Sequence, residues 1–515
     1  MTDRAVRAPD IGLANWLRLR AERTPSRRAI SFEGKTLTYA ALQRRIECVA
    51  SRLAGLGVQK GDRVAYLGLN HPDFLASLFA CARLGAIFVP LNCRLGPVEI
   101  ADIIDDCGAY VLIADPAHAP LAEGMRDRIG GVGHLVCLAP REGWTTFEDE
   151  VSAPVAPQVP ADPDDCVLIL YTSGTTGRAK GVMLSHGNIW WNNVNSLHDY
   201  DVRQGDRVLM VAPLFHIGGL NVVTLLSLQK GAEIVLHAGF DAGASLDAIE
   251  AHGITLMFGV PSIYQFVAAH PRFGTADLSS LRVLMCGGAP LPLPLIRAWE
   301  ERGIAIHQGY GMTEASPLVT YLPAEHAREK AGSAGIAALY TEMRLVDREG
   351  KVVSGPGVPG EVEVRGPNVF RGYWNRPEET AAAFRDGGWF ATGDVAFLDG
   401  DGFLTISDRV KDIIISGGEN IAPAEVESAL LGHPNVADVA VVGVPDPQWG
   451  EAVKAVIVAR GEAPTLEELR SHAASLLARY KLPRVLEVVD VLPRNALGKV
   501  LKYELRRRHR GDAGS

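Results

Sequence analysis

The sequence predicts an α/β protein with mainly parallel sheets in a large N-terminal part and a small, separate α+β domain at its C-terminal end. Three observations predict this. Helical and strand periods alternate from early in the chain, the composition is that of an ordinary globular protein, and the pattern changes after about residue 335. At 515 residues, 47% of them hydrophobic, the chain is long enough for roughly two to four domains.

The first elements follow from hydrophobic spacing. Apolar residues recur at intervals of four and three from Leu42 to Leu56, which predicts a helix with one apolar face that ends at Gly57. Short apolar runs bounded by turn residues then alternate with helical patterns, as in a parallel sheet. Strands are expected over 64–69, 87–91 and 110–114, with helices over 74–84 and 98–106.

A second series of α/β units follows a proline-rich stretch. Prolines recur every third residue from Pro154 to Pro163, which predicts an extended connector. A buried strand is expected next, over 167–170. Further strands are expected over 208–212, 234–236, 254–258, 283–285 and 305–307.

Beyond about residue 335, strands such as 361–364 lie among Gly/Pro turns, which predicts a small β-rich subdomain. The last hundred residues have an alternation of their own, with helices expected over 424–431 and 465–480 and strands over 437–442 and 453–458. We therefore predict an N-terminal domain over 1–410 and a C-terminal domain over 411–515.

Composition excludes several functions. A net charge of −9 argues against a nucleic-acid partner, and the basic cluster at 506–510 is expected to be a solvated face. Seven scattered cysteines, no two closer than twelve residues, exclude a metal site formed by cysteines that are close in sequence. Such scattered cysteines are typical of free thiols in a reducing compartment. The pattern of a signal peptide is lacking, and no apolar run approaches the ~18 residues of a membrane span. We expect a cytoplasmic protein without a transmembrane segment.

The most informative segment is Tyr171-Thr-Ser-Gly-Thr-Thr-Gly-Arg-Ala-Lys180, directly after the predicted buried strand. Its glycines, hydroxyls and lysine offer backbone N–H groups, O–H groups and a cation, which suit phosphate oxygens. The spacing is not that of a Walker loop. An ordinary structural turn is the alternative, and the position after a buried strand favours phosphate binding.

Four further segments accompany this loop: Cys286-Gly-Gly-Ala-Pro290, Gln308-Gly-Tyr-Gly-Met-Thr-Glu314, Gly388-Trp-Phe-Ala-Thr-Gly-Asp394 and Pro493-Arg-Asn-Ala-Leu-Gly-Lys499. Each alone is compatible with a plain turn, a strand end or a solvated lysine. In this order and spacing, from about residue 10 to 505, they resemble the adenylate-forming superfamily of acyl-CoA synthetases, luciferases and peptide-synthetase adenylation domains. In motif style the chain is most similar to bacterial fatty-acid or aryl acyl-CoA ligases.

The resemblance implies an acid–thiol ligase that works in two steps. A carboxylate attacks the α-phosphate of Mg·ATP to form an acyl-adenylate and pyrophosphate, and a thiol, usually that of CoA, then displaces AMP. The expected substrates and cofactors are therefore ATP, Mg²⁺, CoA and a small carboxylic acid. Such phosphoryl chemistry depends on positioning and charge neutralisation, which the residue types in these segments can supply.

The resemblance also implies roles for individual residues. The phosphates would be held by Thr172, Ser173, Gly174, Thr175, Thr176, Gly177 and Lys180. The adenine would lie against Gly288, Ala289 and Pro290, with Tyr310 stacked on it and Gln308, Gly309, Gly311, Met312 and Thr313 around the nucleotide. Glu314 would bind Mg²⁺, Asp394 and Arg409 the ribose, and Lys499 would bridge the attacking carboxylate and the α-phosphate.

In this family the C-terminal domain rotates between the two steps. The resemblance places the hinge at Lys411. After rotation, Gly417, Gly418 and Glu419 would shape the channel for the thiol. One residue that absorbs a change in φ and ψ suffices for such a hinge.

The acyl group is expected near His216, with Gly219, Gly287 and Gly311 beside it. Relatives that activate amino acids have an Asp at the position of His216, so an α-amino acid is not expected. Asp241 imitates that Asp but is expected to begin a helix. The predicted pocket walls, 217–222, 258–264 and 315–319, contain no Arg or Lys. This favours an apolar monocarboxylic acid, whether fatty, aromatic or polycyclic.

Several alternatives stay open at this stage. The enzyme could load an acyl carrier protein in place of free CoA, or catalyse a luciferase-type oxygenation. A catalytically silent protein that binds acyl-AMP or lipid is the alternative from another class, although such a binder has no need of Lys499. The sequence does not determine the oligomeric state, so both a monomer and a homodimer are compatible with it.

Overall fold

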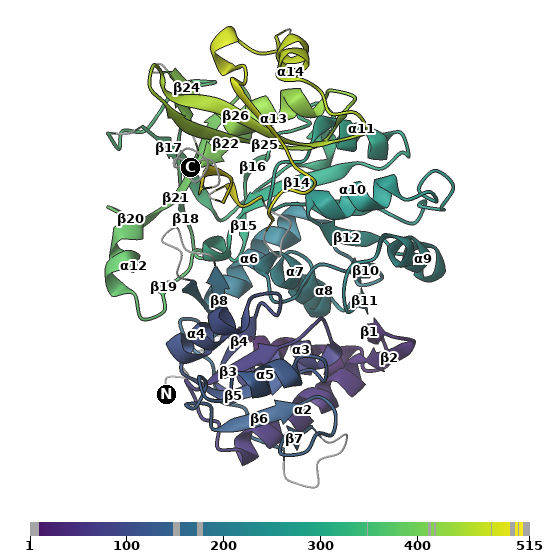
Figure 1. Cartoon of the computed structure of the whole chain (residues 1–515). Coiled ribbons are helices and arrows are strands. Elements are labelled where there is room, and N and C mark those ends of the chain that lie inside the picture. Colours follow the sequence, from purple (N-terminus) through teal and green to yellow (C-terminus); the bar gives the residue numbers. More distant parts are fainter. Residues whose placement is uncertain are drawn as a thin grey trace, which may run out of the picture.

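The computed structural model describes residues 10–147, 155–172, 179–347, 349–409, 412, 414–416, 419–474, 476–494, 500–502 and 504–507. In Figure 1 the N-terminal sheet lies at the bottom, a second sheet in the middle and the C-terminal domain at the top. The described residues form four sheets of nine, eight, five and five strands. The predicted α/β class, with a large N-terminal part and a smaller C-terminal part, is confirmed.

The eight-stranded sheet contains the first predicted strands and the strand before the Gly/Thr loop. Its order is β19-β9-β8-β4-β3-β5-β6-β7, parallel from β8 to β7 and antiparallel at the β9 and β19 edge. The strands are β3 (Arg63–Leu67), β4 (Ile87–Leu91), β5 (Ala109–Ala114), β6 (His134–Cys137), β7 (Thr145–Thr146), β8 (Cys166–Thr172), β9 (Lys180–Ser185) and β19 (Gly372–Tyr373).

Alternate side chains of this sheet enter two different cores, as the pleat of a strand requires. Val64 and Tyr66 of β3 belong to the main core, whereas Ala65 and Leu67 belong to a second core on the other face. The four helices of this part of the chain are α2 (Tyr39–Gly55), α3 (Pro72–Leu84), α4 (Pro97–Cys107) and α5 (Ala119–Gly124). The predicted helix from Leu42 is thus confirmed: Leu42, Ile46, Val49 and Leu53 are buried, and Leu56 caps its end half-buried.

The nine-stranded sheet has the order β16-β15-β14-β13-β12-β10-β11-β1-β2 and is parallel from β14 to β1. Its strands are β1 (Arg28–Phe32), β2 (Lys35–Thr38), β10 (Arg207–Met210), β11 (Glu233–Leu236), β12 (Leu256–Gly259), β13 (Val283–Cys286), β14 (Ile306–Gly311), β15 (Leu318–Tyr321) and β16 (Ile336–Ala337). The neighbouring helices are α1 (Leu13–Arg23), α6 (His186–Asp199), α7 (Ile217–Asn221), α8 (Thr224–Lys230), α9 (Ala242–His252), α10 (Pro261–Ala269) and α11 (Leu293–Glu300), with short 3₁₀ turns η1 (Thr313–Ala315) and η2 (Ala324–His326).

The predicted β-rich subdomain is an antiparallel sheet in the order β17-β18-β21-β20, with β22 paired to β21. Its strands are β17 (Glu342–Val346), β18 (Gly360–Arg365), β20 (Phe384–Arg385), β21 (Trp389–Leu398) and β22 (Leu404–Arg409), and α12 (Pro377–Ala383) precedes β20.

The next strand along the chain belongs to a different sheet, which has two cores of its own. This C-terminal sheet contains β23 (Ile414–Ser416), β24 (Glu419–Ile421), β25 (Val436–Asp446), β26 (Gly450–Ala459) and β27 (Val485–Val488), with α13 (Pro423–Leu431), α14 (Leu466–Ala473) and η3 (Arg479–Lys481). The helix expected over 465–480 is therefore shorter than predicted. Leu469 and Ala473 of α14 are buried, whereas Leu476 beyond the end of the helix is 62% exposed.

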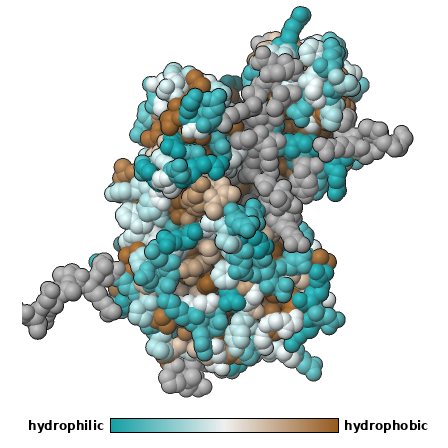
Figure 2. Space-filling view, turned by 90° about the vertical axis from the view of Figure 1, so that its left-hand side faces the viewer, coloured by the Kyte–Doolittle hydropathy of each residue, from teal (hydrophilic) through white to brown (hydrophobic). Residues whose placement is uncertain are grey.

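Hydrophilic residues cover most of the face shown in Figure 2, and apolar residues gather there in small separate groups. Among the helices described here, none has both the length and the hydropathy that a bilayer crossing requires.

Candidate active site

The Gly/Thr loop connects two antiparallel strands. Thr172 at the end of β8 lies opposite Lys180 at the start of β9. The five candidate phosphate ligands between them, Ser173, Gly174, Thr175, Thr176 and Gly177, lie outside the described residues. The strands therefore hold the two ends of the loop, and with them Thr172 and Lys180, at one edge of the eight-stranded sheet.

Tyr373 links the lysine of this loop to the carboxylate expected to bind the metal. The Tyr373 hydroxyl donates a 3.0 Å hydrogen bond to Oε1 of Glu314. The Lys180 ammonium lies 5.2 Å from the centre of the Tyr373 ring and also forms an ion pair with Glu379. Two segments that are 134 positions apart in sequence thus meet on one aromatic ring, which the sequence analysis did not single out.

Glu314 is a reasonable ligand for Mg²⁺, which prefers carboxylate oxygens and usually completes its shell with substrate phosphates and water. A neighbour of this carboxylate is the phenol of Tyr373, an uncharged group that does not repel a cation. A metal site formed by protein ligands alone is not seen: the described parts of the chain contain no group of three His, Cys, Asp or Glu side chains that could hold a metal.

Tyr310 and Asp394 are also brought together. The Tyr310 hydroxyl donates a 2.8 Å hydrogen bond to Oδ2 of Asp394, which is only 7% exposed. Asp394 lies directly opposite Arg409 in the pairing of β21 and β22. The structure therefore places the backbone of both proposed ribose ligands and the proposed adenine-stacking ring in one region, although the Arg409 side chain lies outside what is described.

Gln308 is buried at 7% exposure and contacts backbone groups on two sides. Its Oε1 accepts a 3.0 Å hydrogen bond from the Leu291 N–H, and its Nε2 donates to the Ser333 carbonyl at 3.2 Å. The side chain thus anchors the turn that contains Gly287, Gly288, Ala289 and Pro290. Gly288 has φ +84°, a conformation that favours glycine.

Gly311 permits the closest approach in this region. A Cβ atom there would lie 2.0 Å from the Pro317 carbonyl oxygen, a separation that only glycine allows. The chain turns through Met312 and Thr313 into η1, and the Met312 N–H donates to the same Pro317 carbonyl at 3.0 Å. The predicted nucleotide segment is therefore a compact turn that presents Glu314.

Buried amides that the sequence analysis missed hold this turn from outside. Asn221 donates to the Ser316 carbonyl, and Asn368 donates to the carbonyls of Ala315 and Leu318 at 3.0 and 2.8 Å. Asn192 accepts a 3.0 Å hydrogen bond from the Leu318 N–H. All three asparagines have exposures of 0%. Their sequence signal was weak, since asparagine in helices and loops is usually a surface residue.

His216 caps the N-terminus of α7 and contacts Phe215, with ring centres 4.7 Å apart. Its Nε2 atom is buried without a hydrogen-bond partner in the described protein. Burial, with a smaller contribution from the nearby Arg94, lowers the pKa of His216 to about 3. The imidazole is therefore neutral at physiological pH and offers a polar atom to a ligand.

The glycines next to His216 serve packing. A Cβ at Gly219 would lie 2.2 Å from the Pro213 carbonyl oxygen, and one at Gly218 would lie 3.0 Å from the Phe258 ring. A Cβ at Gly259 would likewise lie 3.0 Å from Ile263, so neighbouring atoms fill the space above all three of these glycines.

Several predicted residues lie outside the described residues: Lys499, Lys411, Gly417 and Gly418. The backbone of Glu419 is described, and it pairs with Ser416 across β23 and β24. Asp241 begins α9 as expected, and its carboxylate accepts a 2.7 Å hydrogen bond from the Ala244 N–H.

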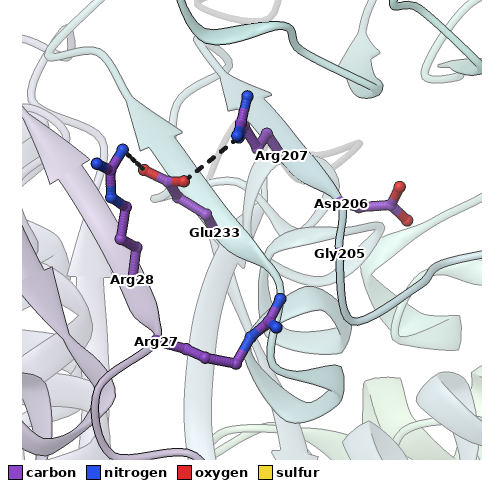
Figure 3. A pocket seen from close by; sticks show the side chains of 6 residues that line it. All are labelled: Arg27, Arg28, Gly205, Asp206, Arg207 and Glu233. Carbon is purple, nitrogen blue, oxygen red and sulfur yellow. Dashed lines mark ion pairs between the residues drawn. The ribbon is translucent and has the colours of Figure 1, made fainter.

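A separate surface cavity of about 160 Å³ lies at the opposite end of the strands of the parallel sheet. Arg28, Arg207 and Glu233, which are the first residues of β1, β10 and β11, line it (Figure 3). Glu233 lies between the two arginines, at 3.9 and 3.7 Å. Since the predicted ligands follow the carboxyl ends of β12, β13 and β14, this ion cluster is not part of the candidate site.

Comparison with known proteins agrees with this arrangement. A family model described as "AMP-binding enzyme" matches residues 17–374, and one described as "AMP-binding enzyme C-terminal domain" matches residues 425–499.

Two curated relatives cover nearly the whole chain. A feruloyl-CoA synthase of Amycolatopsis sp is 50% identical over 96% of this chain and 99% of its own length. An indoleacetate–CoA ligase of Aromatoleum aromaticum is 45% identical over 96% of this chain and 97% of its own length. Among solved structures, ATP-bound MatB from Rhodopseudomonas palustris matches with a TM-score of 0.89 and 32% identity, over 97% of this chain and 99% of that one.

Proposed function

Because this chain belongs to the AMP-binding enzyme family and is an acid–thiol ligase, we propose that it activates an aromatic monocarboxylic acid as the acyl-adenylate and transfers it to CoA. ATP and CoA are substrates of the ligase reaction. The proposal narrows the predicted apolar acid to one with an aromatic ring. The names of the two relatives at 50% and 45% identity, feruloyl-CoA synthase and indoleacetate–CoA ligase, support this choice.

The side chains of the predicted acyl walls support an apolar, singly charged acid. Phe258 and Leu318 are buried at 5% and 6% exposure, and the wall segments contain no Arg or Lys that would fix a second carboxylate. The single observation of the site that carries the proposal is His216. Its buried, neutral imidazole has a nitrogen without a partner in the described protein, which can donate to a carboxylate, and it lacks the negative charge that would fix an α-ammonium group.

The roles of the chain's own residues follow from charge. The reaction brings a carboxylate toward a phosphate, so cations must offset the charge that develops between them. Lys180 lies at the phosphate loop, and Lys499 would approach the α-phosphate from the C-terminal domain. Asp394 and Tyr310 would orient the ribose and the adenine. Mg²⁺ bound at Glu314 would neutralise phosphate charge.

We also propose the division into domains at residues 1–410 and 411–515, with Lys411 as the hinge. The change of sheet between β22 and β23 supports it. Gly417, Gly418 and Glu419 would line the thiol channel after rotation. A cytoplasmic location and a homodimer stay predictions.

Mass spectrometry of the purified protein with Mg·ATP tests the proposed substrate. The acids compared are ferulate, indoleacetate, a long-chain fatty acid and malonate, each with and without CoA. We expect aromatic acyl-CoA with CoA and aromatic acyl-AMP without it. Preferred turnover of the fatty acid or of malonate would contradict the proposed substrate class.

The same assay separates the alternatives for the acceptor. Acyl-adenylate that persists with CoA, but disappears when an acyl carrier protein with its phosphopantetheine arm is added, would identify a carrier protein as the acceptor. Binding of acyl-AMP without turnover of any acid would identify a silent binder.

A further inference from the structure

The segment that leads into α12 lies along the start of β9, the strand that begins with Lys180. β19 pairs with β9 in antiparallel fashion, with Tyr373 opposite Val182. The next residue, Trp374, donates its backbone N–H to the Gly181 carbonyl at 2.7 Å. The chain that enters α12 is therefore bound to the first residues of β9, directly beside the lysine.

Thr380 fixes α12 against this segment. Its Oγ1 accepts a 2.9 Å hydrogen bond from the Tyr373 N–H and donates one of 2.7 Å to the Arg376 carbonyl. Glu379, the residue before Thr380, lies in the first turn of α12 and forms the ion pair with Lys180. The first turn of α12, and Glu379 with it, is thus held in a fixed position relative to the lysine.

Both carboxylate oxygens of Glu379 face cations. Oε2 pairs with the Lys180 ammonium, and Oε1 lies 3.6 Å from Nε of Arg376. Arg376 in turn pairs with Asp106 at 2.7 Å. The charges along this chain alternate in sign. The Lys180 side chain is only 20% exposed, so solvent screens its pair with Glu379 less than it screens a pair on the open surface.

This ion pair has a consequence for any phosphate that approaches Lys180. The charge of the ammonium group is already offset by a carboxylate in contact with it. The same carboxylate also repels a phosphate oxygen, because both are negatively charged. Phosphate oxygens must therefore replace or share the hold of Glu379 on the lysine in order to bind there.

We propose that Glu379 is a positioning residue that competes with phosphate oxygens for Lys180 and thereby weakens the binding of MgATP and of pyrophosphate. The inference rests on the proposed role of Lys180 at the phosphates. When phosphates bind, the lysine passes from Glu379 to them, and Arg376 remains beside the released carboxylate. When the lysine returns to Glu379, pyrophosphate is released more readily after the acyl-adenylate has formed.

A role of Glu379 in helix stability alone predicts the opposite effect on binding. Acidic residues in a first turn stabilise a helix through its dipole, and both Glu378 and Glu379 lie in the first turn of α12. If Glu379 only stabilised the helix, its replacement would loosen α12 and weaken nucleotide binding. Glu378 is exposed and shares the helix position, whereas the ion pair with Lys180 belongs to Glu379, so Glu378 is the matched control.

The first test is calorimetric titration of the whole protein with MgATP and, separately, with pyrophosphate. Glu379→Gln should bind both about three- to fivefold more tightly, which is the size of effect that a partly exposed ion pair permits. Glu378→Gln should bind them as the native protein does. Unchanged or weaker binding in Glu379→Gln would overturn the proposal, and so would equal tightening in both variants.

The kinetics of adenylation give a second measure. Lys180 would hold the phosphates equally before and during the reaction, so loss of its competitor should lower the KM for ATP with little change in the maximal rate of acyl-AMP formation. Inhibition by pyrophosphate should become stronger in the same proportion. A lower maximal rate without a lower KM would identify a purely structural role of Glu379 and overturn the proposal.

Lys180→Gln separates failure of this inference from failure of the role of Lys180 on which it rests. This variant should bind MgATP more weakly, and the further change Glu379→Gln should then have little effect. Unchanged MgATP binding in Lys180→Gln would contradict the proposed phosphate role of Lys180. Weaker binding in Lys180→Gln, together with equal effects of Glu379→Gln in both backgrounds, would overturn only the competition for the lysine.

Glu379→Asp covers the case in which Glu379→Gln does not fold. The shorter side chain keeps the negative charge in the first turn of α12 but withdraws it from Lys180. MgATP should then bind about twofold more tightly than to the native protein. Unchanged or weaker binding by the folded Asp variant would overturn the proposal.

Discussion

At the scale of single residues, the candidate site consists of contacts between side chains from distant motifs. Tyr310 meets Asp394, and Tyr373 joins Glu314 to Lys180. These pairs connect the groups expected at the ribose, the metal and the phosphates. Each can be altered by the loss of one oxygen atom or one charge, so their contributions can be measured separately.

Tyr310→Phe removes the hydroxyl that donates to Asp394 and keeps the ring. We expect the KM for ATP to rise about three- to tenfold with little change in kcat, because one hydrogen bond to the proposed ribose-binding carboxylate is lost. Pyrophosphate release at varied ATP measures this. Tyr373→Phe is the matched control. The Tyr373 hydroxyl contacts Glu314, so its loss should alter the dependence of the rate on Mg²⁺. An equal rise of the KM for ATP in both variants would contradict the role assigned to Tyr310 and Asp394.

Lys499→Ala should reduce the rate of adenylation by about 10²–10³, because a cation that stabilises the transition-state charge is lost. Thioester formation from supplied acyl-adenylate should survive. The two half-reactions are measured separately, with Lys502→Ala as the control, since Lys502 pairs with Glu427 at 3.0 Å. Equal loss of both half-reactions would contradict the role of Lys499.

Asp199 is expected to make stability depend on pH. Burial raises its pKa to about 7, so the folded protein keeps this proton where the unfolded chain has lost it, and stability falls as the pH rises from about 4 to about 7. Asp199→Asn should therefore stabilise the protein by about 1–2 kcal/mol at pH 8, a figure that allows for partial exposure of the carboxyl group. Urea unfolding at pH 5 and pH 8 measures this, and a gain that is equal at both pH values would be inconsistent with titration of Asp199.

At the scale of elements, Asp106 ties three segments together at the end of α4. Its Oδ2 accepts from the Tyr171 hydroxyl at 2.6 Å and its Oδ1 from Arg376 at 2.7 Å, while its carbonyl accepts from the Trp374 indole at 3.1 Å. Tyr171 directly precedes Thr172, and Trp374 follows Tyr373. The position of the phosphate loop relative to Glu314 thus depends on a helix end that contributes no ligand of its own.

Asp106→Ala should lower stability by about 2–4 kcal/mol, because Tyr171 and Arg376 lose their shared partner. It should also raise the KM for ATP, since the strand before the phosphate loop loses its anchor. Thermal unfolding and pyrophosphate release measure the two effects. Asp105→Ala is the control, as its side chain is exposed one position away; similar effects of both variants would exclude the anchoring role of Asp106.

At the scale of the whole molecule, the proposed mechanism would use different surfaces of the C-terminal domain in the two half-reactions. The described part of this domain has its own sheet and cores, so it can move as a unit. Rotation about one residue between β22 and β23 would exchange Lys499 for the segment that contains Glu419.

Lys411→Pro should preserve pyrophosphate release but block transfer to CoA, because proline restricts φ at the hinge. Acyl-AMP should therefore accumulate in the presence of CoA, which mass spectrometry detects. Lys411→Ala, which keeps a free φ, should retain transfer. Unchanged thioester output from the proline variant would move the hinge elsewhere.

The sequence by itself determined the fold class, most elements and the type of chemistry. Apolar spacing located the helix from Leu42 and the buried strand before the Gly/Thr loop, since such local periodicity needs no tertiary information. The end of α14 was misplaced, because whether Leu476 is buried depends on what packs beside it.

Only the tertiary structure decided which residues meet. Tyr373 contacts Glu314 and Lys180, and three buried asparagines hold the turn at Glu314. Gly219 proved to allow a close approach to the Pro213 backbone. The physical reason is that hydrogen bonds, burial and pKa shifts arise between residues far apart in the chain, where no sequence spacing records their distance in space.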